Sequence, residues 1–112
     1  MLFNSENQMQ QFVNKHQWGK ISKNFHGLDT QSKVDLAIAC GSSSDEDASD
    51  FLIYLLEDSD ENVLMQAVKS LGMVGYSNAK THLLALLWKL PDGKEDLKAA
   101  IKEAVAKTSE RR

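Results

Sequence analysis

Apolar residues recur along this chain at the spacing of helices rather than of strands. The clearest stripe contains Leu64, Ala67, Val68 and Leu71, at the i, i+3, i+4, i+7 spacing that lines one side of a helix. A second stripe begins after Ser77, which is predicted to be its N-cap, and consists of Ala79, Leu83, Leu86, Leu87 and Leu90. Because only two to four residues link the two stripes, we predict that the two helices lie antiparallel.

This two-helix pattern repeats along the chain. Shifting the sequence by 31 residues aligns Ile21 with Leu52 and Leu83. The same shift aligns two pairs of less common residue types, Asp29 with Asp60 and Gly41 with Gly72. Internal repetition at such a period indicates stacked helical units. We therefore predict one domain spanning residues 1–112, with copies of the helix pair at about 5–28, 29–58 and 60–90.

Polar residues and glycines mark the predicted helix ends. Asp29 and Asp60 precede the first helices of two pairs, where a carboxylate can accept hydrogen bonds from free backbone N–H groups. Gly72 and Gly75 are predicted to end a helix in the left-handed conformation. A capping helix is expected at about 94–108. Reciprocal capping boxes are predicted at Ser44 with Asp47 and at Asp92 with Glu95.

Composition agrees with an all-α fold. The 112 residues are 42% hydrophobic, with one proline and six glycines, too few turn residues for a small sandwich or barrel. No stretch of 18 consecutive apolar residues occurs, so no membrane span is predicted. Cys40 is the only cysteine, which excludes an intramolecular disulfide and fits a reducing, cytoplasmic setting.

Charge is distributed unevenly along the chain. The formal net charge is +2 for residues 1–28, −9 for 29–62 and +4 for 63–112. A duplex-binding protein gathers basic residues on one surface to neutralise phosphates. The acidic middle argues against nucleic-acid binding, although a basic patch from the last third alone stays open.

The segment 52–87 combines paired leucines, acids before a helix, and glycines after it. With these features it resembles HEAT repeats, especially the short bacterial form also seen in phycobilin lyase subunits. Leu64 stands where the family often has an arginine that bonds neighbouring repeats. The residues that carry the resemblance are Leu55-Leu56, Asp58, Asp60, Val63, Ala67, Leu71-Gly72, Gly75, Ala79, Leu83 and Leu86-Leu87.

The resemblance implies an α–α superhelix, a HEAT-like solenoid of about three antiparallel helix pairs plus the C-terminal capping helix. First helices would lie on the convex side and second helices on the concave side. Such families mostly bind proteins, which favours a protein-binding adaptor or scaffold over an enzyme. Two alternatives stay open: a subunit of a lyase-type enzyme, and a weak nucleic-acid-binding domain.

The second helices offer a candidate partner-binding surface. Its acids and aromatic residues would suit a basic or amphipathic peptide, since aromatic residues dominate interface hot spots and acids attract cationic partners. The competing interpretation is an ordinary solvated face, with one tryptophan covering the last helix. The candidate residues are Asp47, Asp50, Tyr54, Glu57, Thr81 and Trp88.

No pattern in the sequence points to catalysis, a metal site or a cofactor. The histidines His16, His26 and His82 lie in different segments, without a second ligand at i+3 or i+4. Cys40 falls on an apolar stripe, where cysteines usually act as small hydrophobic residues. We expect a monomer or a weakly self-associating protein that binds a protein or peptide.

Overall fold

The structure is a computed structural model that describes residues 5–75 and 77–109. The described part is helical and contains no strand, which confirms the prediction of an all-α fold. The order of elements is α1 (Ser5–Asn14), α2 (Trp18–Asn24), the short 3-10 helix η1 (Phe25–Gly27), α3 (Thr30–Cys40), α4 (Glu46–Leu55), α5 (Glu61–Val74), α6 (Asn78–Lys89) and α7 (Glu95–Thr108).

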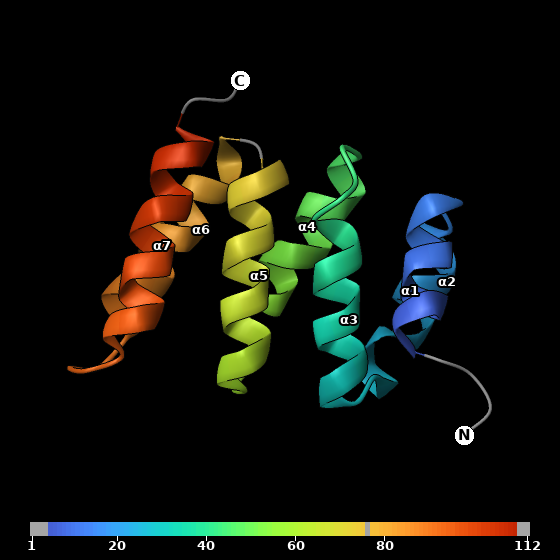
Figure 1. Cartoon of the computed structure of the whole chain (residues 1–112), viewed down its shortest axis with the longest axis horizontal. Coiled ribbons are helices and arrows are strands. Elements are labelled where there is room, and N and C mark those ends of the chain that lie inside the picture. Colours follow the sequence, from blue (N-terminus) through green and yellow to red (C-terminus); the bar gives the residue numbers. More distant parts are fainter. Residues whose placement is uncertain (1–4, 76, 110–112) are drawn as a thin grey trace.

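The helices form two layers. α1, α3, α5 and α7 stand side by side in one layer, and α2, α4 and α6 lie behind them (Figure 1). Within the first layer each helix packs on the next one along the chain, and α5 and α7 also pack on the second-layer helices α4 and α6 that precede them. This is the stacking expected when no helix pair can bury its apolar side alone.

Equivalent apolar positions share one core. Ile21 is 2% exposed, and Leu52 and Leu83 are fully buried. All three belong to a single cluster of buried side chains that runs through the stack. The 31-residue relation read from the sequence therefore corresponds to equivalent environments in the fold.

Polar contacts join helices both between neighbouring helix pairs and within one pair. Ser70 Oγ in α5 donates a buried hydrogen bond of 2.8 Å to the carbonyl oxygen of Ala37 in α3. Lys33 Nζ lies 2.6 Å from Asp58 Oδ2, and both side chains are largely shielded from water. Such contacts fix the register between neighbouring helices, because a buried polar group left without a partner is costly.

The N-caps predicted at Asp29 and Asp60 are confirmed, whereas the hydroxyl of Ser77 does not cap α6. Asp29 Oδ1 accepts a hydrogen bond of 2.8 Å from the backbone N–H of Ser32. Asp60 Oδ1 accepts from the backbone N–H groups of Asn62 at 2.9 Å and Val63 at 3.1 Å. These carboxylates satisfy N–H groups that lack an intrahelical partner.

The prediction that Gly72 and Gly75 end a helix in the left-handed conformation is wrong. α5 continues through Gly72 to Val74, and Gly75 follows it with a φ of −66°. Gly72 is needed for a different reason, which is the close approach of α7. A Cβ at this position would lie 3.3 Å from Ala104 Cα.

The predicted capping boxes are also wrong. The N-cap of α4 is Asp45 and that of α7 is Lys94, and neither side chain caps its helix. The link before α7 passes through the left-handed region at Gly93, with φ of +90°, and at Lys94, with φ of 57°. Lys94 Nζ lies 2.5 Å from Glu61 Oε2 on α5. The turn before α7 is therefore accompanied by an ion pair to another helix, which a pattern of local capping residues does not predict.

Candidate partner-binding surface

The outward side of α4 is acidic. Asp47, Asp50 and Glu57 are exposed, as is the aromatic ring of Tyr54 between them. The spacing of these residues places them on one side of a helix, and the backbone N–H of Glu57 bonds to the Tyr54 carbonyl oxygen at 3.1 Å, continuing the turn past the end of α4. Since α4 itself contains no basic residue, this surface favours cationic groups.

Tyr54 is held by aromatic neighbours although it is 65% exposed. Its ring centroid lies 5.8 Å from that of Phe25 in η1. Phe25 in turn lies 5.7 Å from Phe51, which stacks on Trp18 at 6.0 Å. The sequence analysis did not identify this cluster, because its members come from three elements that only the fold brings together. A supported yet exposed ring loses little side-chain freedom on binding.

A narrow groove separates α4 from α6. It has a volume of about 70 Å³, with Ile53 and Leu56 among its apolar lining residues. Glu57 borders it from α4, and His82 and Lys89 border it from α6. The sequence analysis placed Glu57 in the candidate surface but missed the two basic residues opposite. Their seven-residue spacing on one side of α6 is the signal that could have revealed them.

The α6 members of the candidate set, Thr81 and Trp88, are exposed. Trp88 is 86% exposed, so it does not cover the last helix as the alternative interpretation required. Neither residue lines the groove that faces α4, whereas Ala85 does. The structure thus brings Asp47, Asp50, Tyr54 and Glu57 together and leaves Thr81 and Trp88 on another part of α6.

The start of α4 is tied to the link between α1 and α2. Asp45 Oδ2 accepts hydrogen bonds from His16 Nδ1 and from Trp18 Nε1, the latter at 3.2 Å. The bond from His16 is the main cause that lowers the pKa of the Asp45 carboxyl group. His16 adopts a left-handed φ of 57° at this point. The arrangement positions Trp18 and α4 relative to each other, and so supports the aromatic cluster.

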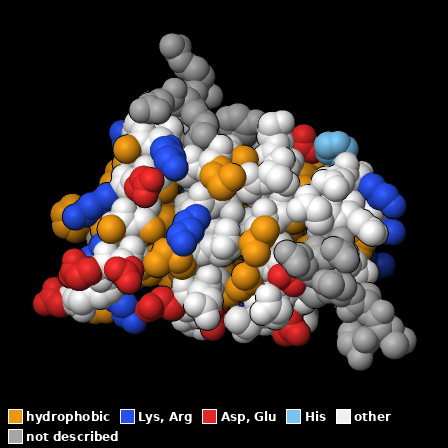
Figure 2. Space-filling model, in the orientation of Figure 1, with side chains coloured by type: hydrophobic (Ala, Val, Ile, Leu, Met, Phe, Trp, Pro, Cys, Tyr) orange, Lys and Arg blue, Asp and Glu red, His pale blue; other side chains and the backbone are white. Residues whose placement is uncertain are grey.

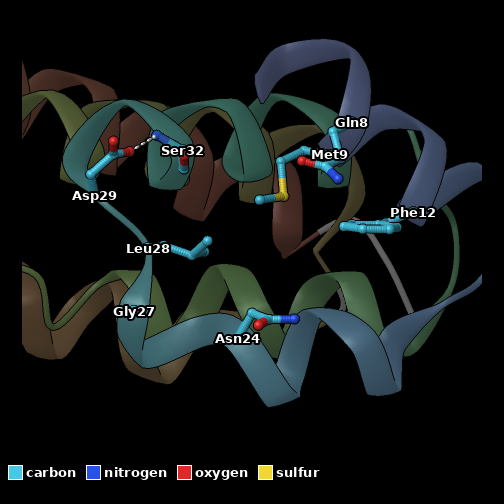
Figure 3. Close-up of a pocket in the computed structure, with 8 residues that line it drawn as sticks. All are labelled: Gln8, Met9, Phe12, Asn24, Gly27, Leu28, Asp29 and Ser32. Atoms are coloured by element: carbon cyan, nitrogen blue, oxygen red, sulfur yellow. Dashed lines mark hydrogen bonds between the residues drawn. The ribbon is translucent and has the colours of Figure 1, made fainter. Parts of the chain in front are cut away.

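Another hollow lies between the first helix pair and the start of α3. It has a volume of about 440 Å³ and opens between α1, η1 and α3. Figure 3 shows Met9, Phe12 and Leu28 around its apolar part, and the Asp29 carboxylate already bonded to Ser32 at its rim. With that carboxylate engaged as an N-cap, the hollow presents no convergent charged groups for a reaction.

The described residues offer little for catalysis. Cys40 is fully buried, and burial raises the pKa of its thiol to about 12, so it stays protonated at neutral pH. His26 is exposed and its ring meets the edge of Phe25 at 5.7 Å. Within the described ranges there is no group of three or more His, Cys, Asp or Glu side chains that could hold a metal ion.

The two layers differ in what they expose. The face of α1, α3, α5 and α7 shows apolar side chains scattered among charged ones (Figure 2). Large hydrophobic residues exposed on these helices are Ile38 at 40% and Met73 at 59%, whereas those on α4 and α6 are the aromatic Tyr54 and Trp88. Aromatic side chains are the more frequent interface anchors, which favours the second-helix face, meaning the outward sides of α2, α4 and α6.

Comparison with known proteins agrees with this architecture. A family model described as HEAT repeats matches residues 27–106. Neither the comparison with curated proteins nor that with solved structures finds a match. None of the described helices is both long and apolar enough to cross a membrane.

Proposed function

Because the chain belongs to the HEAT-repeat family, whose members commonly act as protein-interaction scaffolds, we propose that it is a protein-binding adaptor or scaffold module. Its binding surface is the second-helix face, centred on α4. Repeat stacks build extended surfaces of this kind, because each unit adds one more helix to the same face.

One observation carries the proposal: Tyr54 is an exposed aromatic side chain surrounded by acids. It rests on Phe25, while Asp47, Asp50 and Glu57 extend into solvent beside it. A large side chain kept in place but uncovered supplies binding area at low entropic cost. The acids select the charge of the partner and speed its approach.

The partner we propose is a basic or amphipathic segment of another protein. Its cationic groups would lie over Asp47 and Asp50, and an apolar side chain would cover Tyr54. Glu57 sits opposite Lys89 and His82 across the groove, so the acidic character of the surface weakens toward α6. The preferred contact area therefore runs along α4 toward η1, where the ring of Phe25 next to Tyr54 adds apolar surface.

The proposal is tested by capture of partners from extracts of the native cells, followed by mass spectrometry. The double variant Asp50→Ala with Tyr54→Ala is compared with the unaltered chain. Truncating an interface hot spot typically costs about 2 kcal/mol or more, so recovery of the true partner should fall steeply. Raising the salt concentration should also reduce recovery, because exposed charges are screened.

Met73→Ala provides the matched control. Met73 is also exposed, at 59%, but lies on α5 in the other layer. Its loss should leave recovery and the far-UV circular dichroism spectrum unchanged. If the double variant stays folded and recovers the same partner in the same amount, the α4 surface is not the binding site.

The proposal also covers the domain organisation of the chain and the cellular compartment in which it acts. We propose that residues 1–112 act as one module whose copies are the three helix pairs, with α7 as the capping helix. The resemblance carried by residues 52–87 favours the short bacterial form of the repeat. The single buried Cys40 suits a reducing, cytoplasmic environment, where free thiols persist, and the module would act as a monomer or a weak self-associating species.

A further inference from the structure

A second surface lies at the far end of the stack, on the sides of α6 and α7 turned away from α4 and α5. His82, Ala85 and Lys89 mark the side of α6 that faces α4, and Glu103 and Lys107 mark the side of α7 that faces α5. Helical spacing assigns the remaining edge to other residues. We call it the α6–α7 edge, made of Leu84, Leu87, Trp88, Lys98, Lys102 and Val105.

The apolar part of this edge is open. Trp88 is 86% exposed, and Leu84, Leu87 and Val105 are each only partly buried. Leu87 and Val105 also pack against the core, and together with Leu84 and Trp88 they place apolar surface on both helices of this edge. We call these four residues the apolar strip. Trp88 is the largest exposed apolar side chain of that strip, which is the property expected of an interface anchor.

The repeat itself indicates what shape fits the edge. Shifting back by 31 residues, Leu84 corresponds to Ile53 on α4, and Leu87 and Trp88 correspond to Leu56 and Glu57 directly after it. Those three residues line the groove against α6, and Leu56 is only 5% exposed. A helix, α6, therefore borders the equivalent side of the preceding unit, where Leu56 is buried and Glu57 stays exposed. The occupant of the α6–α7 edge would be a helix in the same relative position.

Charge indicates what kind of helix fits. Lys98 and Lys102 flank the strip on α7, and within the described ranges neither forms an ion pair. Acids near this end of the molecule are Asp92 in the link before α7 and Glu95 and Asp96 in its first turn. The middle of the edge is thus apolar and basic, and it would attract acidic groups.

We propose that the α6–α7 edge binds an acidic amphipathic helix of a partner protein. The apolar side of that helix covers Trp88 and Leu84, and its carboxylates face Lys98 and Lys102. This surface is separate from α4 and selects the opposite charge, so the protein would join a basic and an acidic partner at two places. Helix-in-groove recognition of this kind reads apolar anchors at i, i+3, i+4 and i+7.

A second copy of this chain stacked end to end is a poorer occupant. The opposite end of the stack is formed by α1 and α2, and residues 5–28 contain Lys15, Lys20 and Lys23 against one acid, Glu6. Bringing that end onto Lys98 and Lys102 would oppose like charges, which costs binding free energy. The charge pattern thus favours a different protein.

The test uses a fluorescein-labelled synthetic peptide about 16 residues long, with leucines at helical i, i+3, i+4, i+7 spacing and glutamates on the flanks. Its binding to the full chain is followed by fluorescence anisotropy. In a parallel ¹⁵N-correlated NMR titration the indole N–H signal of Trp88 should shift and that of Trp18 should not. We expect Trp88→Ala to raise the Kd about tenfold or more, as for a hot-spot residue.

Matched variants separate this surface from the one on α4. Lys98→Glu with Lys102→Glu should also raise the Kd about tenfold, whereas Tyr54→Ala should change it less than about twofold. The lysine control peptide, with every glutamate replaced by lysine, is compared with the acidic peptide on the Asp50→Ala, Tyr54→Ala double variant, so that the acidic α4 surface does not bind it. It should bind that variant about tenfold more weakly than the acidic peptide does, or worse. Far-UV circular dichroism verifies that each variant is folded.

Three outcomes would overturn the inference. The first is no binding of the acidic peptide at concentrations up to about 1 mM. The second is equal binding of the acidic and lysine peptides to the Asp50→Ala, Tyr54→Ala double variant, which would mean unspecific apolar adhesion. The third is a concentration-dependent dimer that Trp88→Ala abolishes, because the edge would then bind a second copy. None of these results bears on capture through Asp50 and Tyr54, so the two proposals can fail separately.

Discussion

Gly41 and Gly72 stand 31 residues apart and both adjoin a neighbouring helix. A Cβ at Gly41 would lie 2.7 Å from Ser70 Oγ, and one at Gly72 would lie 3.3 Å from Ala104 Cα. Neither position has the positive φ that favours glycine. The glycines are therefore required by close approach between helices rather than by backbone conformation.

This leads to a prediction for Gly41→Ala. Its new methyl group would displace Ser70, whose hydroxyl donates to the carbonyl of Ala37 at 2.8 Å. Overpacking of this kind typically costs about 1–3 kcal/mol, and urea denaturation should report it. Gly19→Ala is the control: nothing lies within 4 Å of a Cβ there, and alanine should stabilise α2 by about 0.5–1 kcal/mol. A neutral Gly41→Ala would contradict the packing argument.

Asp58 makes stability depend on pH. Burial by itself raises the pKa of this carboxyl group, but hydrogen bonds from Lys33 Nζ and from the backbone N–H of Asp60 outweigh burial and lower the pKa from 3.8. The unfolded chain therefore takes up this proton more readily than the folded one. The stabilisation is complete above the unfolded pKa and is lost as the pH falls through the folded value.

We accordingly expect the free energy of unfolding to fall as the pH is lowered from about 5 to about 3. Asp58→Asn should be less stable than the unaltered chain at neutral pH, because Lys33 loses its partner. It should also lose less stability on acidification. Denaturation at several pH values measures both effects, and parallel curves for the two proteins would show that Asp58 contributes nothing to the acid response.

The helices α5 and α6 both begin after a short polar residue, but only at α5 does its side chain accept hydrogen bonds from the backbone. Asp60 accepts two backbone hydrogen bonds at the start of α5. Ser77 occupies the same place before α6 with a φ of −58° and a ψ of −25°, and its hydroxyl makes no capping bond. The same sequence signal, a short polar residue before an apolar stripe, thus produces a cap in one helix and none in the other.

The two sites form a matched pair for mutation. Asp60→Ala should destabilise the protein by about 1 kcal/mol, within the usual range of 0.5–2 for a lost N-cap. Ser77→Ala should change stability by less than about 0.5 kcal/mol, as most surface substitutions do. Thermal and chemical denaturation measure the difference. Equal effects of the two substitutions would indicate that the Asp60 bonds do not contribute.

For the molecule as a whole, the core is continuous across the helix pairs. Leu52 is fully buried in the middle of the stack, in the same cluster as Ile21 and Leu83. Leu52→Ala should lower the free energy of unfolding by about 2–5 kcal/mol, through lost burial and the cavity left behind. Far-UV and near-UV circular dichroism should still report one shared transition. Separate transitions would mean that the helix pairs unfold independently.

The helical fold could be predicted from the periodicity of apolar residues, because an apolar stripe on a helix becomes buried whichever helix packs against it. The 31-residue shift placed Ile21, Leu52 and Leu83 in equivalent positions, and capping chemistry placed Asp29 and Asp60 correctly. These features depend on neighbours within a turn or two along the chain. They can be read locally for that reason.

The tertiary structure decided what depends on distant residues. It extended α5 through Gly72, placed Phe25 beneath Tyr54, set His82 and Lys89 opposite Glu57, and turned Trp88 away from α4. Each of these facts joins side chains from different helices, whose distance is set by the packing of the whole stack. A helical pattern tells which side of a helix is buried, but only the stack determines which neighbour lies against it.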